Sequence, residues 1–177
     1  MNIVTFATAV SVAPPKIWAV SLYTNTLTRR AFLDAKVGVL QLLRPDQSKL
    51  VSILGKRSGY EEGYDKWDEC RRAGFEWVSY CPDDDVDLVA ESTGPSKLEE
   101  AVGLQVLPGC ASYIKLKMLS YHNAGDHDVA LCEVLDTAIW SDEVRKVVNC
   151  SAEGVPFPAL DPTTALYTGQ LREEGII

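Results

Sequence analysis

Runs of apolar residues, some of them alternating with polar ones, predict the strands of this chain. The run Ile17–Tyr23 is almost wholly apolar, which predicts a strand buried on both faces, and Val37–Leu43 predicts a second strand. Apolar residues alternate with lysines in Cys110–Tyr121, a pattern typical of a strand with one solvated face. The turn His122–Gly125 leads to another apolar run, Val129–Leu135, so these last two strands are expected to form a hairpin.

Helical periodicity and capping residues predict several short helices around these strands. The expected positions are Thr28 as N-cap to about Lys36, Pro45 to Gly55, Asp65 to Ala73, a short helix capped by Ser141, and a last helix from Asp161-Pro162 to about Gly175. Because strands follow one another with few helices between them, the order favours an antiparallel β-barrel over a doubly wound sheet. We therefore expect an α+β fold, mainly β with peripheral helices, in a single domain over 1–177. Its core should cover about 2–136, with a helical extension at 141–177.

Composition narrows the function classes. A chain of 177 residues that is 46% apolar suits one globular domain or one subunit of a compact dimer. The net charge of −8 argues against a nucleic-acid surface, because neutralising phosphates requires clustered Lys and Arg. No apolar run approaches the roughly 18 residues of a membrane-spanning helix, so no membrane partner is expected.

The cysteines and acidic residues do not predict a metal site. The five cysteines form no CxxC pair and no Cys/His spacing typical of zinc. The acidic run at 83–87 lacks the glycine and glutamate that an EF-hand loop needs at its sixth and twelfth positions, so we expect a solvated loop there. An odd cysteine count with no signal peptide ahead of the first block predicts reduced thiols. The expected location is therefore the cytoplasm or an organelle stroma, and not secretion.

The first segment of the chain, 2–28, is rich in small and hydroxyl-bearing residues. Thr5, Thr8 and Ser11 are spaced three apart, and no Lys or Arg interrupts the block before Lys16. Hydroxyls and unobstructed backbone N–H groups suit a planar ligand with a phosphate tail. A second hydroxyl-rich group follows the strand at Tyr23. Threonine and asparagine are also ordinary turn and cap residues, so a structural role alone is the alternative.

Two further segments combine charge with a turn. The loop Lys56–Gly59 places two cations and the hydroxyl of Ser58 after a helix, where they would either complement the helix dipole or contact a phosphate. His127 lies between Asp126 and Asp128 at the hairpin turn. It is either a turn residue or an imidazole that donates to an anionic or nicotinamide ligand.

Five blocks of the sequence carry a family resemblance. FATAVSVAPP, IWAVSLYTNTLT, VGVLQLL, LGKRSG and GDHDVALCEV follow in this order over about Asn2 to Asp136. In order and approximate spacing they resemble the flavin reductase-like, FMN-binding split-barrel family. The resemblance implies an antiparallel split β-barrel that binds FMN, or alternatively FAD, at the interface of a homodimer. It also implies an NAD(P)H-dependent flavin reductase, whose reduced flavin often passes to a separate monooxygenase.

The resemblance also assigns roles to residues. The residues expected to bind the isoalloxazine edge and the ribityl chain are Thr5, Phe6, Ala7, Thr8 and Ser11. Those expected to bind the tail are Tyr23, Thr26, Thr28 and Ser58. His127 would meet the phosphate or the nicotinamide, as the catalytic residue. The competing hypotheses are a non-catalytic flavin- or heme-binding protein on the same barrel and a dimeric scaffold. No GxGxxG is present, so any nicotinamide is expected to bind outside a Rossmann fold.

Overall fold

A curved antiparallel sheet forms most of the computed structural model, which describes residues 1–4, 6–80, 104–150, 165–166 and 168–176. The strand order is β1-β2-β7-β6-β3, and β8 pairs with β7. The strands are β1 (Ala7–Ser11), β2 (Ile17–Tyr23), β3 (Val37–Leu42), β6 (Ser112–Ala124), β7 (His127–Ser141) and β8 (Lys146–Asn149). A separate two-stranded sheet consists of β4 (Val78–Ser79) and β5 (Gln105–Val106).

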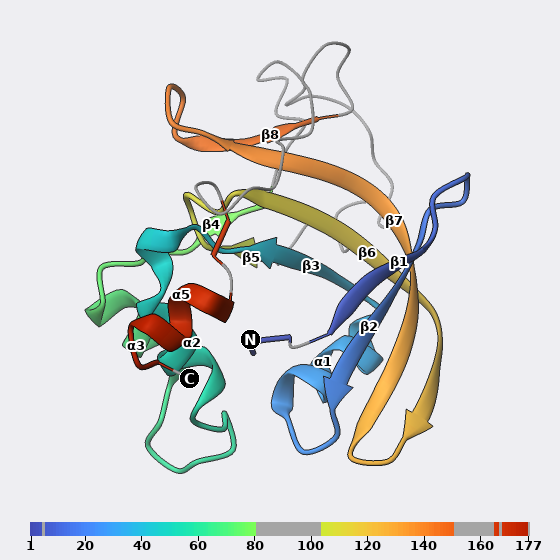
Figure 1. Cartoon of the computed structure of the whole chain (residues 1–177), viewed down its shortest axis with the longest axis horizontal. Helices are drawn as coiled ribbons and strands as arrows, with labels where there is room; N and C mark the ends of the chain where they lie inside the picture. Colours follow the sequence, from blue (N-terminus) through green and yellow to red (C-terminus); the bar gives the residue numbers. More distant parts are fainter. Residues whose placement is uncertain (5, 81–103, 151–164, 167, 177) are drawn as a thin grey trace, which may run out of the picture.

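The helices are short and lie beside the sheet. They are α1 (Leu27–Ala35), the 3-10 helix η1 (Pro45–Gln47), α2 (Lys49–Gly55), α3 (Lys66–Arg72) and α5 (Thr168–Glu173). Figure 1 shows α2, α3 and α5 grouped on one side of the molecule, while α1 lies against the barrel near β2 and β3. The prediction of a mainly antiparallel β fold with few, peripheral helices is confirmed.

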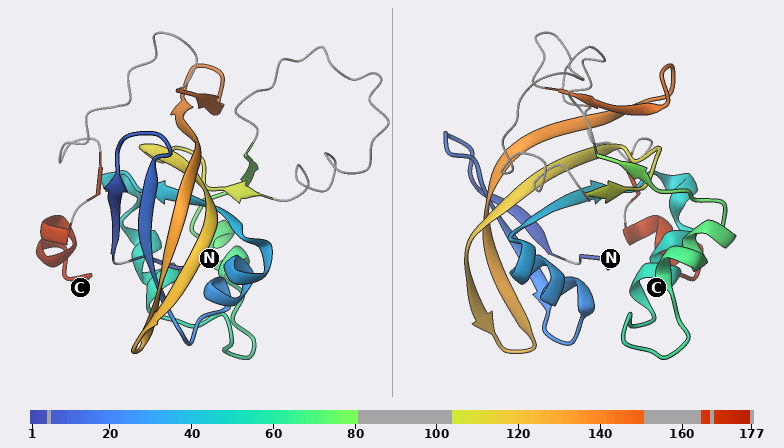
Figure 2. Two further views of the ribbon diagram at one scale, coloured as in Figure 1. Left: turned by 90° about the vertical axis from the view of Figure 1, so that its right-hand side faces the viewer. Right: turned by 180° about the vertical axis from the view of Figure 1, so that it is seen from behind.

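The long strands β6 and β7 form the spine of the barrel, and the views from the side and from behind show how strongly they curve (Figure 2). The first half of β7 pairs with β2, from His127 opposite Tyr23 to Glu133 opposite Ile17, and its last residues pair with β8. The β6–β7 register shifts at two β-bulges, which bend a ladder of this length. The long β6–β7 hairpin thus pairs with β3 on one side and with β2 and β8 on the other.

Two apolar clusters form the core. One lies inside the barrel and contains Val20, Leu22, Ile114, Leu116, Met118, Ala130 and Cys132. The other joins α2 and α3 to the far end of the sheet and contains Leu50, Leu54, Cys70, Tyr80, Val106, Leu107, Cys110, Tyr113, Ala138 and Val147. Leu50, Val51 and Leu54 of α2 are all buried, so the helix has one apolar face against the core.

Several predicted details are wrong. The strand β2 is not buried on both faces: only Val20 and Leu22 are buried, while the other residues of the strand are partly buried or, at Tyr23, exposed. No helix follows Ser141. That segment is a tight turn between β7 and β8, in which Arg145 adopts a positive φ of 54° and the hydroxyl of Ser141 accepts a bond from the Val144 amide.

The hairpin turn between β6 and β7 is shorter than predicted. His122 and Asn123 belong to β6, and Gly125, with φ of 80°, begins the turn before His127 opens β7. The predicted acidic loop at 83–87 and the start of the last helix at 161–162 lie outside the described residues. Among the residues that the structure describes, no helix is long and apolar enough to span a bilayer.

Candidate functional site

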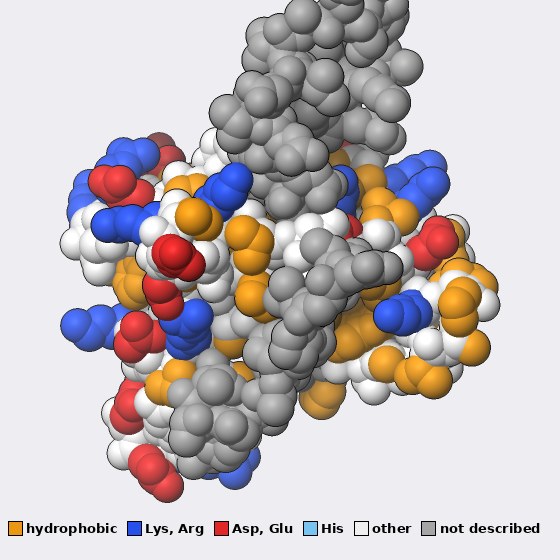
Figure 3. All heavy atoms as spheres, turned by 90° about the horizontal axis from the view of Figure 1, so that it is seen from above, with side chains coloured by type: hydrophobic (Ala, Val, Ile, Leu, Met, Phe, Trp, Pro, Cys, Tyr) orange, Lys and Arg blue, Asp and Glu red, His pale blue; other side chains and the backbone are white. Residues whose placement is uncertain are grey.

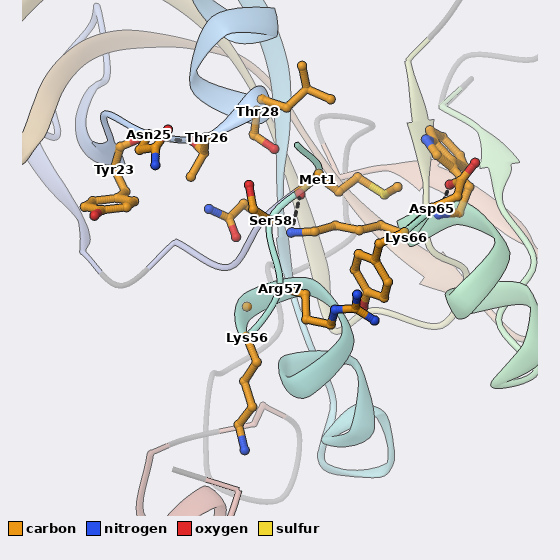
Figure 4. Close-up of a pocket in the computed structure, with 16 residues that line it drawn as sticks. Met1, Tyr23, Asn25, Thr26, Thr28, Lys56, Arg57, Ser58, Asp65 and Lys66 are labelled. Atoms are coloured by element: carbon orange, nitrogen blue, oxygen red, sulfur yellow. Dashed lines mark hydrogen bonds between the residues drawn. The ribbon is translucent and has the colours of Figure 1, made fainter. Parts of the chain in front are cut away.

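A cavity of about 480 Å³ opens between the start of α1, the N-terminal segment, the loop after α2 and the start of α3 (Figure 4). Its lining includes Met1, Asn2, Tyr23, Asn25, Thr26, Leu27, Thr28, Gly55, Lys56, Arg57, Ser58, Gly59, Tyr64, Asp65, Lys66 and Trp67. The four predicted tail-binding residues all line this cavity and come from two separate segments of the chain, the end of β2 with the start of α1 and the loop after α2. The four residues are Tyr23, Thr26, Thr28 and Ser58.

The start of α1 forms one wall of the cavity. Thr26, and not the predicted Thr28, is its N-cap: the backbone at Thr26 is extended, and its Oγ1 accepts a bond of 3.2 Å from the Arg29 amide. The same hydroxyl donates to the Tyr23 carbonyl at 2.9 Å. The hydroxyl of Thr26 is thus already used in capping, while that of Thr28 carries no hydrogen bond within the described part of the chain. Amides of a first helical turn point out of the helix end and favour an anion there.

The loop Lys56–Gly59 forms the facing wall. It approaches α1 closely, since a Cβ added to Gly59 would lie 3.4 Å from the Leu27 side chain. The Ser58 hydroxyl accepts a 3.2 Å bond from the Tyr60 amide, which leaves its own proton to donate. Figure 4 shows the Lys56 side chain extending away from the other labelled residues, whereas that of Arg57 turns toward the Lys66 side of the cavity.

The Arg57 side chain is held by two neighbours. Its guanidinium carbon lies 3.8 Å from the centroid of the Tyr64 ring, and its Nε donates to Glu61 Oε2 at 2.8 Å. The other oxygen of Glu61 accepts a 2.8 Å bond from the Ser58 amide. These two hydrogen bonds lower the pKa of the Glu61 carboxyl, the Ser58 amide first and Arg57 second, so it carries its negative charge at neutral pH.

Lys66 is a buried lysine at the base of the cavity, and the sequence did not single it out. Its ammonium donates to the carbonyls of Leu54 and Met1, so it neutralises the carboxyl end of α2 and ties the N-terminal segment to it. Burial lowers the pKa of Lys66. The adjoining start of α3 is capped by Asp65, whose Oδ1 accepts a 2.7 Å bond from the Trp67 amide.

His127 lies beside the cavity and not in its lining. Its ring centroid is 5.3 Å from that of Tyr23, the residue paired with it across β2 and β7. Its Nδ1 is 2.8 Å from Asp126 Oδ1, and this contact is the main reason for a lowered pKa of the Asp126 carboxyl. The imidazole thus has one nitrogen oriented by a carboxylate and sits next to an aromatic residue that does line the cavity.

A buried ion pair fastens α1 to the hairpin that carries His127. Arg29 Nε donates to Asp128 Oδ2 at 2.6 Å, and the Asp128 side chain is only 1% exposed. Asn123 donates to the other carboxylate oxygen at 3.3 Å. Sequence reasoning missed this pair, because its members are 99 positions apart and only the folded register of β2 against β7 brings them together.

The predicted ring-binding residues form a separate group. Phe6, Ala7, Thr8 and Ser11 lie on or next to the edge strand β1 and do not line the cavity, and Thr5 lies outside the described residues. Phe6 is 71% exposed, and most of β1 is also exposed. The Ser11 hydroxyl donates to the Ala13 carbonyl at 3.1 Å within the turn toward β2. The N-terminal block is therefore an open edge of the sheet.

No metal site is evident within the described ranges, where no cluster of three or more His, Cys, Asp or Glu side chains could hold an ion. The four cysteines described, Cys70, Cys110, Cys132 and Cys150, are all unpaired. The cavity instead offers hydroxyls, cations and backbone amides, which are groups that bind phosphates.

The fold is an antiparallel split barrel, and its cavity is lined by hydroxyl-bearing and cationic side chains. The family model of the flavin reductase like domain matches residues 2–156, and the chain belongs to that family. A search of curated proteins gave no match. The sequence-based prediction of the family and of its split-barrel fold is thereby confirmed.

Solved structures share this fold at low sequence identity. An FMN-binding protein from Thermus thermophilus, with bound 1-cyclohex-2-enone, superposes with a TM-score of 0.53 at 22% identity over 80% of this chain and 62% of its own. The NADH:FAD oxidoreductase of Streptomyces globisporus C-1027 gives 0.52 at 18% identity, over 80% and 67%. The styrene monooxygenase flavin reductase of Pseudomonas putida S12 gives 0.51 at 14%, over 78% and 68%. The chain thus spans about three fifths of the length of the Thermus protein.

Proposed function

We propose that this protein is a flavin reductase that transfers hydride from NAD(P)H to FMN, with FAD as the alternative flavin, at the interface of a homodimer. Family membership supports the class of reaction. The observation that carries the proposal is the cavity, because it gathers Tyr23, Thr26, Thr28 and Ser58 beside the cationic side chains of Arg57 and Lys66. Among the solved structures of the same fold are an FMN-binding protein and an NADH:FAD oxidoreductase.

The cavity fits the anionic tail of a flavin nucleotide. The first turn of α1 contains no acidic residue, and its first residues, Leu27 and Thr28, line the cavity wall. The hydroxyls of Thr28 and Ser58 are available to donate, and the Arg57 guanidinium adds a positive charge at the facing wall. A phosphate bound here would be held by amides, hydroxyls and a cation together.

The flat ring system would lie toward β1, where the main chain is open. The outer edge of β1 pairs with no other strand among the described residues, and Phe6, Val10 and Val12 expose 71%, 56% and 81% of their surfaces. Seen from above, hydrophobic side chains reach the surface at this end of the molecule (Figure 3). A second copy of the chain placed on this face would cover them and close the ring site, in keeping with the homodimer expected from the sequence.

The protein's own groups would supply position and electrostatics. When bound, the flavin supplies the hydride-accepting centre. The imidazole of His127, oriented by Asp126 and packed against Tyr23, would donate a hydrogen bond at the open face where the nicotinamide arrives. Arg57 and Ser58 would fix the tail, and the dimer face would exclude water from the ring. Reduced flavin would then leave for a separate monooxygenase.

Absorbance and turnover test the proposal together. The purified protein is titrated with FMN, its visible spectrum is recorded, and NADH and NADPH oxidation is followed under air. Bound flavin with oxidation of either nucleotide above the rate of free FMN is the expected result. Bound flavin without oxidation would leave a non-catalytic binder, and no binding of FMN or FAD would overturn the proposal.

A further inference from the structure

We propose that Glu61 is a positioning residue for the flavin phosphate: it lies outside the cavity and holds Arg57 and Ser58 in the arrangement that receives the anion. The inference rests on the proposed function and adds a residue to its site. Arg57 and Ser58 line the cavity, whereas Glu61 is absent from the described lining. Its carboxylate therefore contacts the loop from behind and leaves the cavity itself open.

Each carboxylate oxygen of Glu61 accepts a separate hydrogen bond. Oε1 accepts from the Ser58 amide and Oε2 accepts from Arg57 Nε, both at 2.8 Å. The Arg57 guanidinium has five N–H donors, and the single Nε–H bond to Glu61 leaves the four at the two Nη atoms for a ligand. The Ser58 amide is directed out of the cavity by this contact, while the hydroxyl proton of the same residue stays available.

Tyr64 completes the support from the opposite side of the guanidinium. Its ring lies 3.8 Å below the Arg57 guanidinium carbon, and its hydroxyl donates to the Ile53 carbonyl of α2 at 2.8 Å. The Tyr64 amide also donates to the Glu61 carbonyl at 3.2 Å. Glu61 thus binds the edge of the Arg57 guanidinium, and the Tyr64 ring covers one of its faces. The Tyr64 ring is itself anchored to α2. A side chain fixed in this way loses less conformational entropy when it binds an anion.

The charge of Glu61 and its positioning role predict opposite changes in FMN affinity when the residue is removed. A carboxylate close to a bound phosphate repels it, so simple electrostatics predicts that removing Glu61 tightens FMN binding. Positioning predicts the reverse, because without Glu61 the loop and the guanidinium are no longer held. The direction of the change in FMN affinity therefore distinguishes the two effects. Glu62 is a matched control, since it carries the same charge one position later, is exposed, and makes no described side-chain contact.

The experiment compares FMN with riboflavin, which lacks the phosphate. Flavin fluorescence titrations on the wild type, Glu61→Ala, Glu61→Gln and Glu62→Ala give both dissociation constants at one ionic strength. For Glu61→Ala we expect the FMN constant to rise about fivefold, the size of an exposed ion pair with good geometry, and the riboflavin constant to change less than about twofold. Glu61→Gln, which can still accept one of the two bonds, should fall between, and Glu62→Ala should match the wild type.

Amide exchange gives a second readout without any flavin. The Ser58 amide should exchange faster with solvent in Glu61→Ala than in the wild type or Glu62→Ala, with similar melting temperatures in all three. FMN binding that is unchanged or tighter in Glu61→Ala, or an equal loss for FMN and riboflavin, overturns the inference alone. A wild type that binds neither flavin, or binds both equally, overturns the phosphate site of the proposed function as well.

Discussion

The ion pair between Arg29 and Asp128 should contribute strongly to the stability of the barrel. The Asp128 carboxylate is almost fully buried, and the Arg29 side chain is 29% exposed. Removing one partner of a buried pair typically costs about 3–5 kcal/mol, because the remaining charge stays buried without its counterpart. We reduce this to about 2–3 kcal/mol for Arg29→Met, since Arg29 is partly solvated and Asn123 still donates to Asp128.

Thermal and urea unfolding measure this effect. For a chain of this size, the loss corresponds to a fall in the melting temperature of about 5–10 °C. Arg30→Met is the control, because Arg30 is the next residue of α1, is exposed, and has no described partner. The double variant with Asp128→Asn completes a cycle, in which we expect a coupling energy of about 1–2 kcal/mol.

Melting temperatures of Arg29→Met and Arg30→Met within about 2 °C of each other, which is less than the effect of 1 kcal/mol, would contradict a stabilising ion pair. Losses of the two single variants that simply added in the double variant would contradict it as well. Either result would mean that the pair does not fasten α1 to the hairpin. The cavity wall formed by α1 would then need another source of rigidity.

Four further expectations follow from the site and the core. Thr26→Ala should lose about 1 kcal/mol in urea unfolding through the lost cap, whereas Thr26→Ser should retain it; equal losses would contradict the cap. His127→Ala should lower kcat for NADH oxidation about tenfold or more while changing FMN affinity little, and a kcat within twofold would remove its catalytic role. Val12→Asp should convert a dimer to a monomer in sedimentation, and an unchanged dimer would place the interface elsewhere. Burial raises the pKa of the Cys110 thiol to about 12 from 9.0, so the unfolded thiol ionises first and stability should fall as the pH rises above about 9. In Cys110→Ala the alkaline drop in melting temperature should be smaller, and an identical drop would contradict this assignment.

The sequence predicted four of the six strands in the main sheet, β2, β3, β6 and β7, because each contains an apolar run that is bounded by turn residues. β2 and β3 lie where the apolar runs placed them, within one residue, and α3 lies within one residue at each end of the helix predicted over Asp65 to Ala73. The segment after Ser141 was mistaken for a helix because serine followed by acidic residues resembles an N-cap and first turn. The same residues also suit a hairpin turn, and pairing of β8 with β7 decides between the two.

The candidate site was predicted only in part, for a physical reason. Hydroxyl-rich segments are visible along the chain, and Tyr23, Thr28 and Ser58 do meet at one cavity. Lys66 and Glu61 were missed, because an isolated Lys or Glu in a charged stretch carries no local signal. Their roles arise from contacts with backbone groups of other segments, which exist only after the chain has folded.

We expect the flavin tail to occupy the cavity between α1 and the Lys56–Gly59 loop. Phosphorus NMR of FMN bound to the wild type and to a Thr28→Val/Ser58→Ala variant tests it most directly. We predict that the phosphate resonance shifts and broadens on binding to the wild type, and that this change is largely lost in the variant. A resonance that stays at its position in free FMN, while the flavin fluorescence is quenched by the protein, would mean that the phosphate remains in solvent and would contradict the claim.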